Sequence, residues 1–115
     1  MTGIAAGTGV DATALALAHE PLPADSVLSG EPTTALHPLA RVGRTEVGIW
    51  EMSPGTASDT EVDEVFVVLS GRARIAFEDP ALPDLEVGPG SVVRLAEGMR
   101  TVWRVTETLR KVYVA

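Results

Sequence analysis

Residues 64–71 read Glu64-Val-Phe-Val-Val-Leu-Ser-Gly71 and form the strongest fold signal in the chain. A carboxylate opens an apolar run rich in valine, and a glycine ends it, which is typical of a buried strand followed by a turn. Because residues 65–69 are all apolar, we expect both faces of this strand to be buried. Gly88-Pro-Gly90 and Ala96-Glu-Gly98 repeat the turn signal before further strands. Together these segments predict a small β-barrel.

Strand signals recur at short intervals from Arg44 to the end of the chain, separated by Gly, Pro and Asp, as in all-β sandwiches and barrels. The predicted strands are residues 45–52, 65–69, 72–78, 85–87, 91–95, 99–105 and 108–114. Alternation in residues 72–78 places Ala73, Ile75 and Phe77 inward. Residues 79–84 contain two prolines and are predicted to form a loop. No helical period is sustained after Arg44, so no helix is expected there.

The N-terminal part of the chain differs in composition from the rest. Residues 1–21 are rich in Ala, Gly and Thr, which predicts a flexible tail with one helical turn around Ala12–Ala18. Residues 22–39 carry three prolines and a glycine, which favours an extended lead-in along an edge of the barrel. We therefore expect one domain over residues 22–115.

Size and charge limit the classes of partner. A chain of 115 residues fits one domain, and its net charge of -7 repels nucleic-acid phosphates and anionic lipid headgroups. No Lys or Arg precedes Arg41, and no apolar run approaches the ~20 residues of a membrane span. With no cysteine, the chain has no disulfide framework and no sulfur-ligated metal site. These features predict a cytoplasmic protein without nucleic-acid or membrane partners.

The order and spacing of nine landmarks resemble one protein family. The landmarks are Gly30-Glu-Pro32, Gly48-Ile-Trp-Glu51, Pro54-Gly55, Asp63-Glu64, Leu69-Ser-Gly71, Gly88-Pro-Gly90, Gly98, Trp103 and Arg110-Lys-Val-Tyr113. The chain from about residue 22 onward is similar to a cupin domain of the ureidoglycine aminohydrolase type, a group that also resembles the cupin domain of an ethanolamine-utilisation protein. The resemblance implies an all-β cupin (RmlC-like) fold, a double-stranded β-helix or jelly-roll barrel. It also implies a small-molecule ligand in the barrel mouth and a homodimer.

The metal-ligand positions of the resembling family are mostly changed in this chain. Metal-binding cupins carry two histidines and a glutamate in the first motif and a third histidine in the second. Of these only Glu64 is retained, and Thr101 stands in place of the last histidine. The first motif holds Ser58, Asp59 and Thr60 instead. We therefore expect no cofactor, and a divalent metal at Glu64 is the less favoured alternative.

Two other groups of polar residues are given structural interpretations. The acidic run Asp59, Glu61, Asp63 and Glu64 could supply oxygen ligands to a hard cation. It lacks the spacing of a calcium loop, so a solvated loop is the preferred prediction. His19 and His37 lie outside the barrel motifs and are predicted to be loop residues without a partner.

Glu64, Lys111 and Tyr113 are the candidate catalytic residues. A carboxylate entering an apolar strand must be hydrogen-bonded, paired, metal-bound or neutral. Lys111 and Tyr113 share one face of the last strand and could flank Glu64 if that face points inward. The alternative is that Glu64 is a turn carboxylate and that Val112 and Val114 form the core.

Trp50, Thr101 and Trp103 are the candidate substrate-binding residues. Trp103 shares a face with Thr101, the former ligand position, and Trp50 shares a face with Gly48 and Met52. Large rings in an aromatic-poor chain are more often core or interface anchors, so that interpretation stays open.

Two functions follow from these residues. One is a domain that binds a small polar metabolite and has lost its metal ligands. The other is an enzyme acting on a small ureido or amino-acid-like substrate, with Glu64 as acid or base or as a residual metal ligand. Fold analogy alone does not decide between them.

Overall fold

A computed structural model describes residues 3–115 of the chain, and it is built almost entirely of β-strands. Residues 1 and 2 of the predicted tail lie outside the described residues. The strands are β1 (Glu20–Pro21), β2 (Val27–Ser29), β3 (Thr33–Val42), β4 (Thr45–Met52), β5 (Gly55–Thr60), β6 (Glu64–Asp79), β7 (Ala81–Val87), β8 (Val92–Leu95) and β9 (Arg100–Val114). A single 3-10 turn, η1 (Ala24–Ser26), precedes β2. No helix within residues 3–115 is long and apolar enough to cross a membrane.

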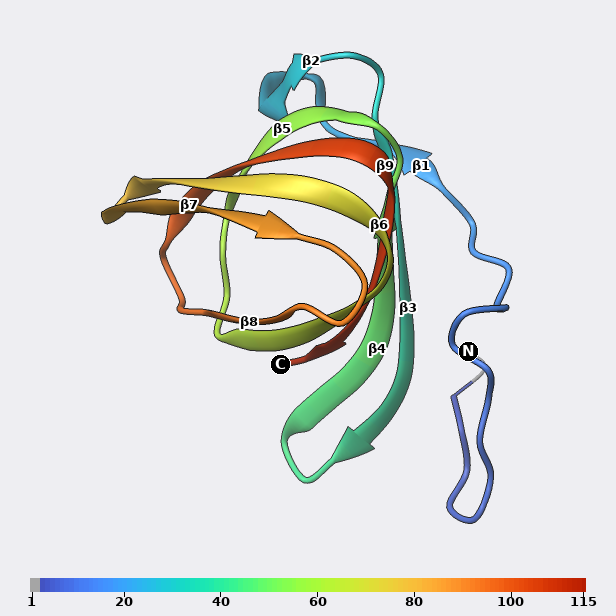
Figure 1. Cartoon of the computed structure of the whole chain (residues 1–115). Coiled ribbons are helices and arrows are strands. Elements are labelled where there is room, and N and C mark those ends of the chain that lie inside the picture. Colours follow the sequence, from blue (N-terminus) through green and yellow to red (C-terminus); the bar gives the residue numbers. More distant parts are fainter. Residues whose placement is uncertain (1–2) are drawn as a thin grey trace.

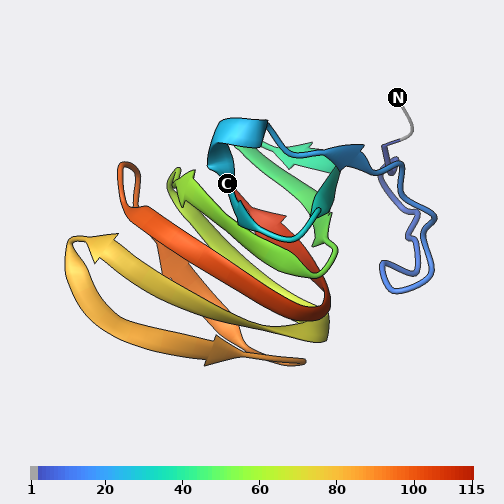
Figure 2. The ribbon, with the colours of Figure 1, turned by 90° about the horizontal axis from the view of Figure 1, so that it is seen from above.

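The described strands form one antiparallel sheet of nine strands that curls into a barrel (Figure 1). β9 lies at its centre and pairs with β4, β5 and β6, while β6 also pairs with β7 and β8. Seen from above, β6 with β7 and β3 with β4 lie toward opposite ends of the molecule (Figure 2). The all-β barrel predicted from the sequence is thus confirmed.

Gly71 has a steric role in the pairing of β6 with β9. It has a φ of +90°, and a Cβ atom on it would lie 2.0 Å from the carbonyl oxygen of Thr108. Only glycine fits such a close backbone approach without strain. The register between the two strands shifts on both sides of Arg72, and such bulges bend a strand and increase its twist. The glycine that ends the apolar run therefore allows the sheet to curl.

The barrel core contains the inward residues of these strands. Ala73 and Ile75 are buried and Phe77 is half-buried, as alternation predicted, while Arg72, Arg74 and Glu78 are exposed. The buried cluster consists of Met52, Ala57, Phe66, Val68, Ala73, Ile75, Val87, Val93, Leu95, Trp103, Val105, Leu109 and Tyr113. Aliphatic side chains fill most of it.

Two predictions about β6 and its neighbour are wrong. Val65 and Val67 each remain 37% exposed in the single chain, so only one face of the apolar run is buried. Residues 79–84 do not form a loop, because β6 ends at Asp79 and β7 begins at Ala81. β7 pairs only with β6, and an edge strand of this kind tolerates Pro83 because its outer N–H positions need no partner.

Other boundaries also differ from the sequence predictions. The two strands predicted over residues 99–105 and 108–114 are replaced by one continuous strand, β9, which begins at Arg100. The lead-in contains a regular strand, β3, which pairs with β4 along most of its length. His37 is therefore a strand residue and not a loop residue. Its backbone lies opposite Ile49.

The N-terminal segment, residues 3–19, contacts the outer face of the barrel. The amide of Ile4 donates to the carbonyl of Leu39 at 2.7 Å. Buried Arg110 donates to the carbonyl of Ala12 at 2.9 Å and to Glu51 at 2.6 Å. The helical turn predicted over Ala12–Ala18 does not form in the described chain. Flexibility of the segment in solution stays a prediction.

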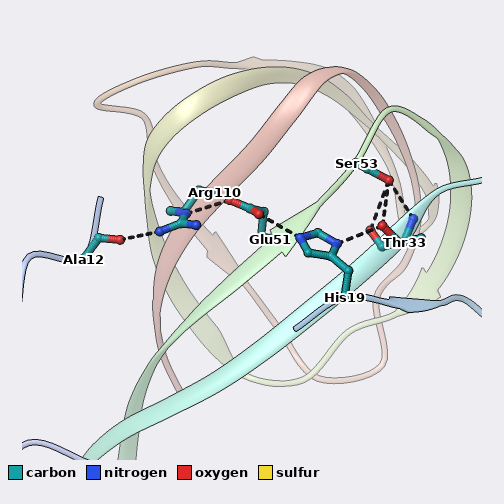
Figure 3. Close-up of polar contacts among 6 residues, drawn as sticks. All are labelled: Ala12, His19, Thr33, Glu51, Ser53 and Arg110. Atoms are coloured by element: carbon teal, nitrogen blue, oxygen red, sulfur yellow. Dashed lines mark hydrogen bonds and ion pairs between the residues drawn. The ribbon is translucent and has the colours of Figure 1, made fainter. Parts of the chain in front are cut away.

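His19 closes this network on the outside of the sheet (Figure 3). One ring nitrogen lies 2.8 Å from Glu51 Oε1 and the other 2.8 Å from Thr33 Oγ1. The expectation that His19 has no partner is therefore wrong. A chain of contacts runs from Ala12 through Arg110 and Glu51 to His19 and ties the segment to β3, β4 and β9 (Figure 3).

Candidate functional site

A cavity of about 540 Å³ lies inside the barrel. Its polar and aromatic wall consists of Glu46, Trp50, Ser58, Asp59, Thr60, Glu61, Glu64, Trp103, Lys111 and Tyr113. Leu22, Pro23 and Ser26, in and beside η1, also line it. The cavity thus combines rings, several carboxylates and one lysine.

Lys111 and Glu64 form a buried ion pair in this cavity. Lys111 Nζ donates to Glu64 Oε2 at 2.7 Å, and the two residues are only 5% and 9% exposed. The alternation of β9 turns Lys111 and Tyr113 inward, while Val112 is half-buried and Val114 exposed on the other face. The inward alternative for Lys111 and Tyr113 is therefore the one that the chain adopts. Glu64 meets the requirement for a partner that its burial imposes.

Three aromatic rings surround the ammonium group of Lys111. Its Nζ lies 4.6 Å from the ring centre of Trp50, 4.2 Å from that of Phe66 and 4.9 Å from that of Trp103. Each ring face attracts a cation. Together with Glu64 these rings hold the ammonium group in place, which makes it a fixed cation and hydrogen-bond donor.

Glu61 is the functional candidate that the sequence analysis missed. It is 5% exposed, and its Oε2 accepts hydrogen bonds from Thr101 Oγ1 at 2.6 Å and Trp103 Nε1 at 2.9 Å. The prediction that the acidic run is a solvated loop is therefore wrong for Glu61 and Glu64. It holds for Asp63, which is exposed beside Arg94. Ala57 and Asp59 face inward two positions apart on β5, and the next residue in that alternation is Glu61.

Asp59 and Tyr113 have pKa values shifted by their surroundings. Loss of solvent and then the charge of Glu61 raise the pKa of Asp59 to about 6, although the residue as a whole is exposed. Burial and the hydrogen bond from its hydroxyl to Glu46 at 2.8 Å raise the pKa of Tyr113 above its usual value. Tyr113 is therefore a protonated phenol at neutral pH, able to donate but not to act as a base.

The residues present do not fit a metal ion. No three His, Asp or Glu side chains within residues 3–115 group as a metal site requires. Glu64 Oε2 is engaged by the ammonium group of Lys111 at 2.7 Å, so this oxygen is not available to a metal ion. His19 is held on the outer face of the sheet by Glu51 and Thr33. No step of the chemistry below is assigned to a metal.

The cavity brings together most of the predicted site residues. Glu64, Lys111, Tyr113, Trp50 and Trp103 all line it. Thr101 does not, because it is fully buried behind the wall, where its hydroxyl donates to Glu61 and accepts from Trp103 Nε1 at 3.1 Å. Its role is to position that carboxylate.

Comparison with known proteins identifies the fold. A family model described as the EutQ-like cupin domain matches residues 39–113. No curated protein matches the chain.

Solved structures of similar fold cover most of the chain. A protein of unknown function from Pseudomonas syringae pv. tomato, of the DUF861 family, is 24% identical with a TM-score of 0.75; the match covers 91% of this chain and 46% of that one. This chain thus spans about half of that protein. A Rhizobium leguminosarum protein of unknown function is 26% identical with a TM-score of 0.63, covering 70% and 78%.

A third structure carries a functional name. It is a putative ethanolamine utilization protein Q from Salmonella typhimurium, which is 17% identical with a TM-score of 0.68; the match covers 100% of this chain and 89% of that one. Identities this low support the fold and not the activity. Since the family model covers well over half of the residues, the chain belongs to the EutQ-like cupin domain family.

Proposed function

We propose that this chain is a binding domain that holds a small polar metabolite in its barrel cavity without a metal ion. The observation that carries the proposal is the cavity of about 540 Å³ with a buried Lys111–Glu64 pair in its wall. Ligand sites commonly have volumes of roughly 300–1,000 Å³, apolar walls and a few convergent polar groups. This cavity has each of those properties.

The roles of the wall residues follow from their chemistry. Trp50 and Trp103, with ring centres 5.5 Å apart and ring planes tilted by 56°, offer an apolar surface to the body of a ligand. Tyr113 offers a phenol, and Asp59 and Glu61 offer acceptors. The Lys111–Glu64 pair fixes the polar end of the cavity, and it needs no ligand to remain satisfied.

A thermal-shift screen of small polar metabolites tests this proposal. A ligand that binds only the folded state stabilises it by RT ln(1 + [L]/Kd), so the melting temperature rises with ligand concentration. Trp50→Ala should abolish the shift, and Glu86→Gln should preserve it, because Glu86 is exposed on β7. A hit whose shift persists in Trp50→Ala, or a broad screen with no hit, would contradict the proposal.

An enzyme is the second candidate, favoured by the distance of 2.7 Å between Lys111 and Glu64 and by the presence of Tyr113 in the same cavity. We propose, as this alternative, activity of the ureidoglycine aminohydrolase type on a ureido or amino-acid-like substrate. Glu64 would accept or donate the proton, and Lys111 and Tyr113 would orient the substrate.

A turnover assay on such substrates, with and without Mn²⁺, separates the two candidates. Metal-independent turnover lost in Glu64→Gln but kept in Glu86→Gln would support the enzyme. If a compound of this class binds in the cavity but no compound of the class is turned over, the binding domain is the supported function.

We also propose that the protein is a homodimer. Val65 and Val67 on β6 and Val114 on β9 leave an exposed apolar surface, with Val65 paired directly to Val114. Light scattering should give twice the mass of the 12.1 kDa chain, and Val67→Lys should lower it to that of one chain. A monomeric wild type would contradict the proposal.

A further inference from the structure

We infer that the ligand carries a positively charged nitrogen, an ammonium or amidinium group, which binds between Asp59 and Glu61 while its apolar body packs against Trp50. This inference rests on the proposed function, because it names the chemical class of ligand for the same cavity.

The charge balance of the cavity wall supports a cationic ligand. Four carboxylates line it, those of Glu46, Asp59, Glu61 and Glu64, against one cation, Lys111. Lys111 forms its ion pair with Glu64. Glu46 accepts the hydroxyl of Tyr113 and lies 3.5 Å from Arg41. Among the described residues, Asp59 and Glu61 have no ion-pair partner.

Glu61 has one oxygen open to the cavity. Both of its hydrogen bonds, from Thr101 and Trp103, go to Oε2 and come from neutral donors. Within residues 3–115, every side-chain oxygen or nitrogen that is sealed from solvent has a hydrogen-bond partner. Oε1 accepts no hydrogen bond, so it is not sealed from solvent. Glu61 is 95% buried and lines the cavity, so the space that Oε1 faces is the cavity. A buried carboxylate without a countercharge is costly, and a bound cation would offset that cost.

Asp59 lies close enough to the Glu61 carboxylate to feel its charge. Its backbone pairs with that of Thr101, whose hydroxyl binds Glu61. The raised pKa of Asp59 reflects loss of solvent and then repulsion from Glu61. A cation between the two carboxylates would relieve this repulsion.

An anionic ligand and a bare metal ion fit less well. The only lysine in the wall already has a carboxylate and three rings around it. A metal ion needs more ligands than the described residues bring together. An organic cation instead uses both halves of the wall, the carboxylates for its charge and Trp50 for its body.

Three probes of similar size that differ in charge test the inference on the full chain: benzylamine, benzyl alcohol and benzoate. Isothermal titration at pH 7.5 should give benzylamine at least a ten-fold lower Kd than benzyl alcohol, and benzoate the weakest binding. Asp59→Asn should weaken benzylamine about ten-fold and leave benzyl alcohol unchanged. Asp84→Asn, the same change at an exposed carboxylate of β7, should affect neither.

The outcomes separate this inference from the proposed function. If the alcohol or the carboxylate binds as tightly as the amine, or Asp59→Asn weakens all three probes equally, the cationic class is wrong while the cavity remains a ligand site. If no probe binds, the cationic class is overturned, and the thermal-shift screen of polar metabolites decides separately whether the cavity is a ligand site.

Discussion

Tyr113 lies directly over the backbone of Gly48. The two residues pair across β4 and β9, and a Cβ atom on residue 48 would lie 2.4 Å from the phenol oxygen and 2.6 Å from the ring carbon that bears it. Glycine at this position therefore makes the space that the ring occupies. The inward position of Tyr113 at the cavity wall depends on that space.

Gly48→Ala should displace the Tyr113 ring and destabilise the fold by about 1–3 kcal/mol, as forced overpacking does. Urea unfolding measures the loss, and the hydrogen bond to Glu46 should weaken with it. Gly9→Ala is the matched control, because nothing lies within 4 Å of its Cβ position. Equal stability of the two variants would show that Tyr113 does not need the space.

Breaking the Lys111–Glu64 pair on one side should be strongly destabilising. Lys111→Met leaves a buried carboxylate without its partner, which costs about 3–5 kcal/mol. The double variant Lys111→Met with Glu64→Leu removes both charges and should recover much of that loss. Chemical denaturation of the single and double variants checks this. A double variant no more stable than Lys111→Met would mean that the pair is not the source of the effect.

The pH dependence of stability should show the ionisation of Asp59. In the folded chain Asp59 has a pKa of about 6, whereas an aspartate side chain in the unfolded chain loses its proton near pH 3.8. Folding therefore binds a proton between these values, and this group's contribution to the free energy of unfolding falls as pH rises from about 4 to about 6.

Asp59→Asn removes the destabilising ionisation of this carboxyl, so it should raise the free energy of unfolding above pH 6 by about 1 kcal/mol. This value is discounted because the side chain is partly solvated. Groups around it that carry charge are Glu61, Glu64 and Lys111 in the cavity, and Asp25, Glu78 and Arg100 in the neighbouring hollow of about 360 Å³. Thermal melts from pH 4 to 7.5 measure the effect. Parallel curves for Asp59→Asn and wild type would contradict it.

Arg110→Lys should release the N-terminal segment from the barrel. The guanidinium holds the carbonyl of Ala12 with one nitrogen and the Glu51 carboxylate with another, and an ammonium group cannot reproduce that fork (Figure 3). Amide hydrogen exchange should rise in residues 3–19 and stay unchanged in β6. Arg104→Lys, an exposed arginine on the same strand, is the control. Unchanged exchange in residues 3–19 would assign the anchoring to other contacts.

Divalent metal should have no effect on the wild type, because Lys111 engages Glu64. Melting temperatures with EDTA, Mn²⁺ or Zn²⁺ should agree, and elemental analysis should find no stoichiometric metal. A metal-dependent rise in the melting temperature would contradict this and would point to a coordination set that includes Glu64.

The sequence predicted the barrel because its signals are local. The apolar run after Glu64, the turn glycines and the alternation of Ala73, Ile75 and Phe77 each act within a few residues. The same local reasoning misjudged Val65 and Val67, since the number of covered faces depends on neighbours distant in the chain. It also divided β9 in two, because the polar residues Thr106 and Glu107 resemble a turn when the paired strand is not seen.

Within the site, the sequence alone determined which residues share a face: Lys111 with Tyr113, and Thr101 with Trp103. Only the tertiary structure decided which face points inward, because that depends on the pairing of β9 with three other strands. Burial next to Glu64 and three rings made Lys111 a fixed cation, and the strand register brought Glu61 to Trp103. The Lys111–Glu64 and Glu61–Trp103 contacts each join residues more than forty positions apart, and no local pattern encodes them.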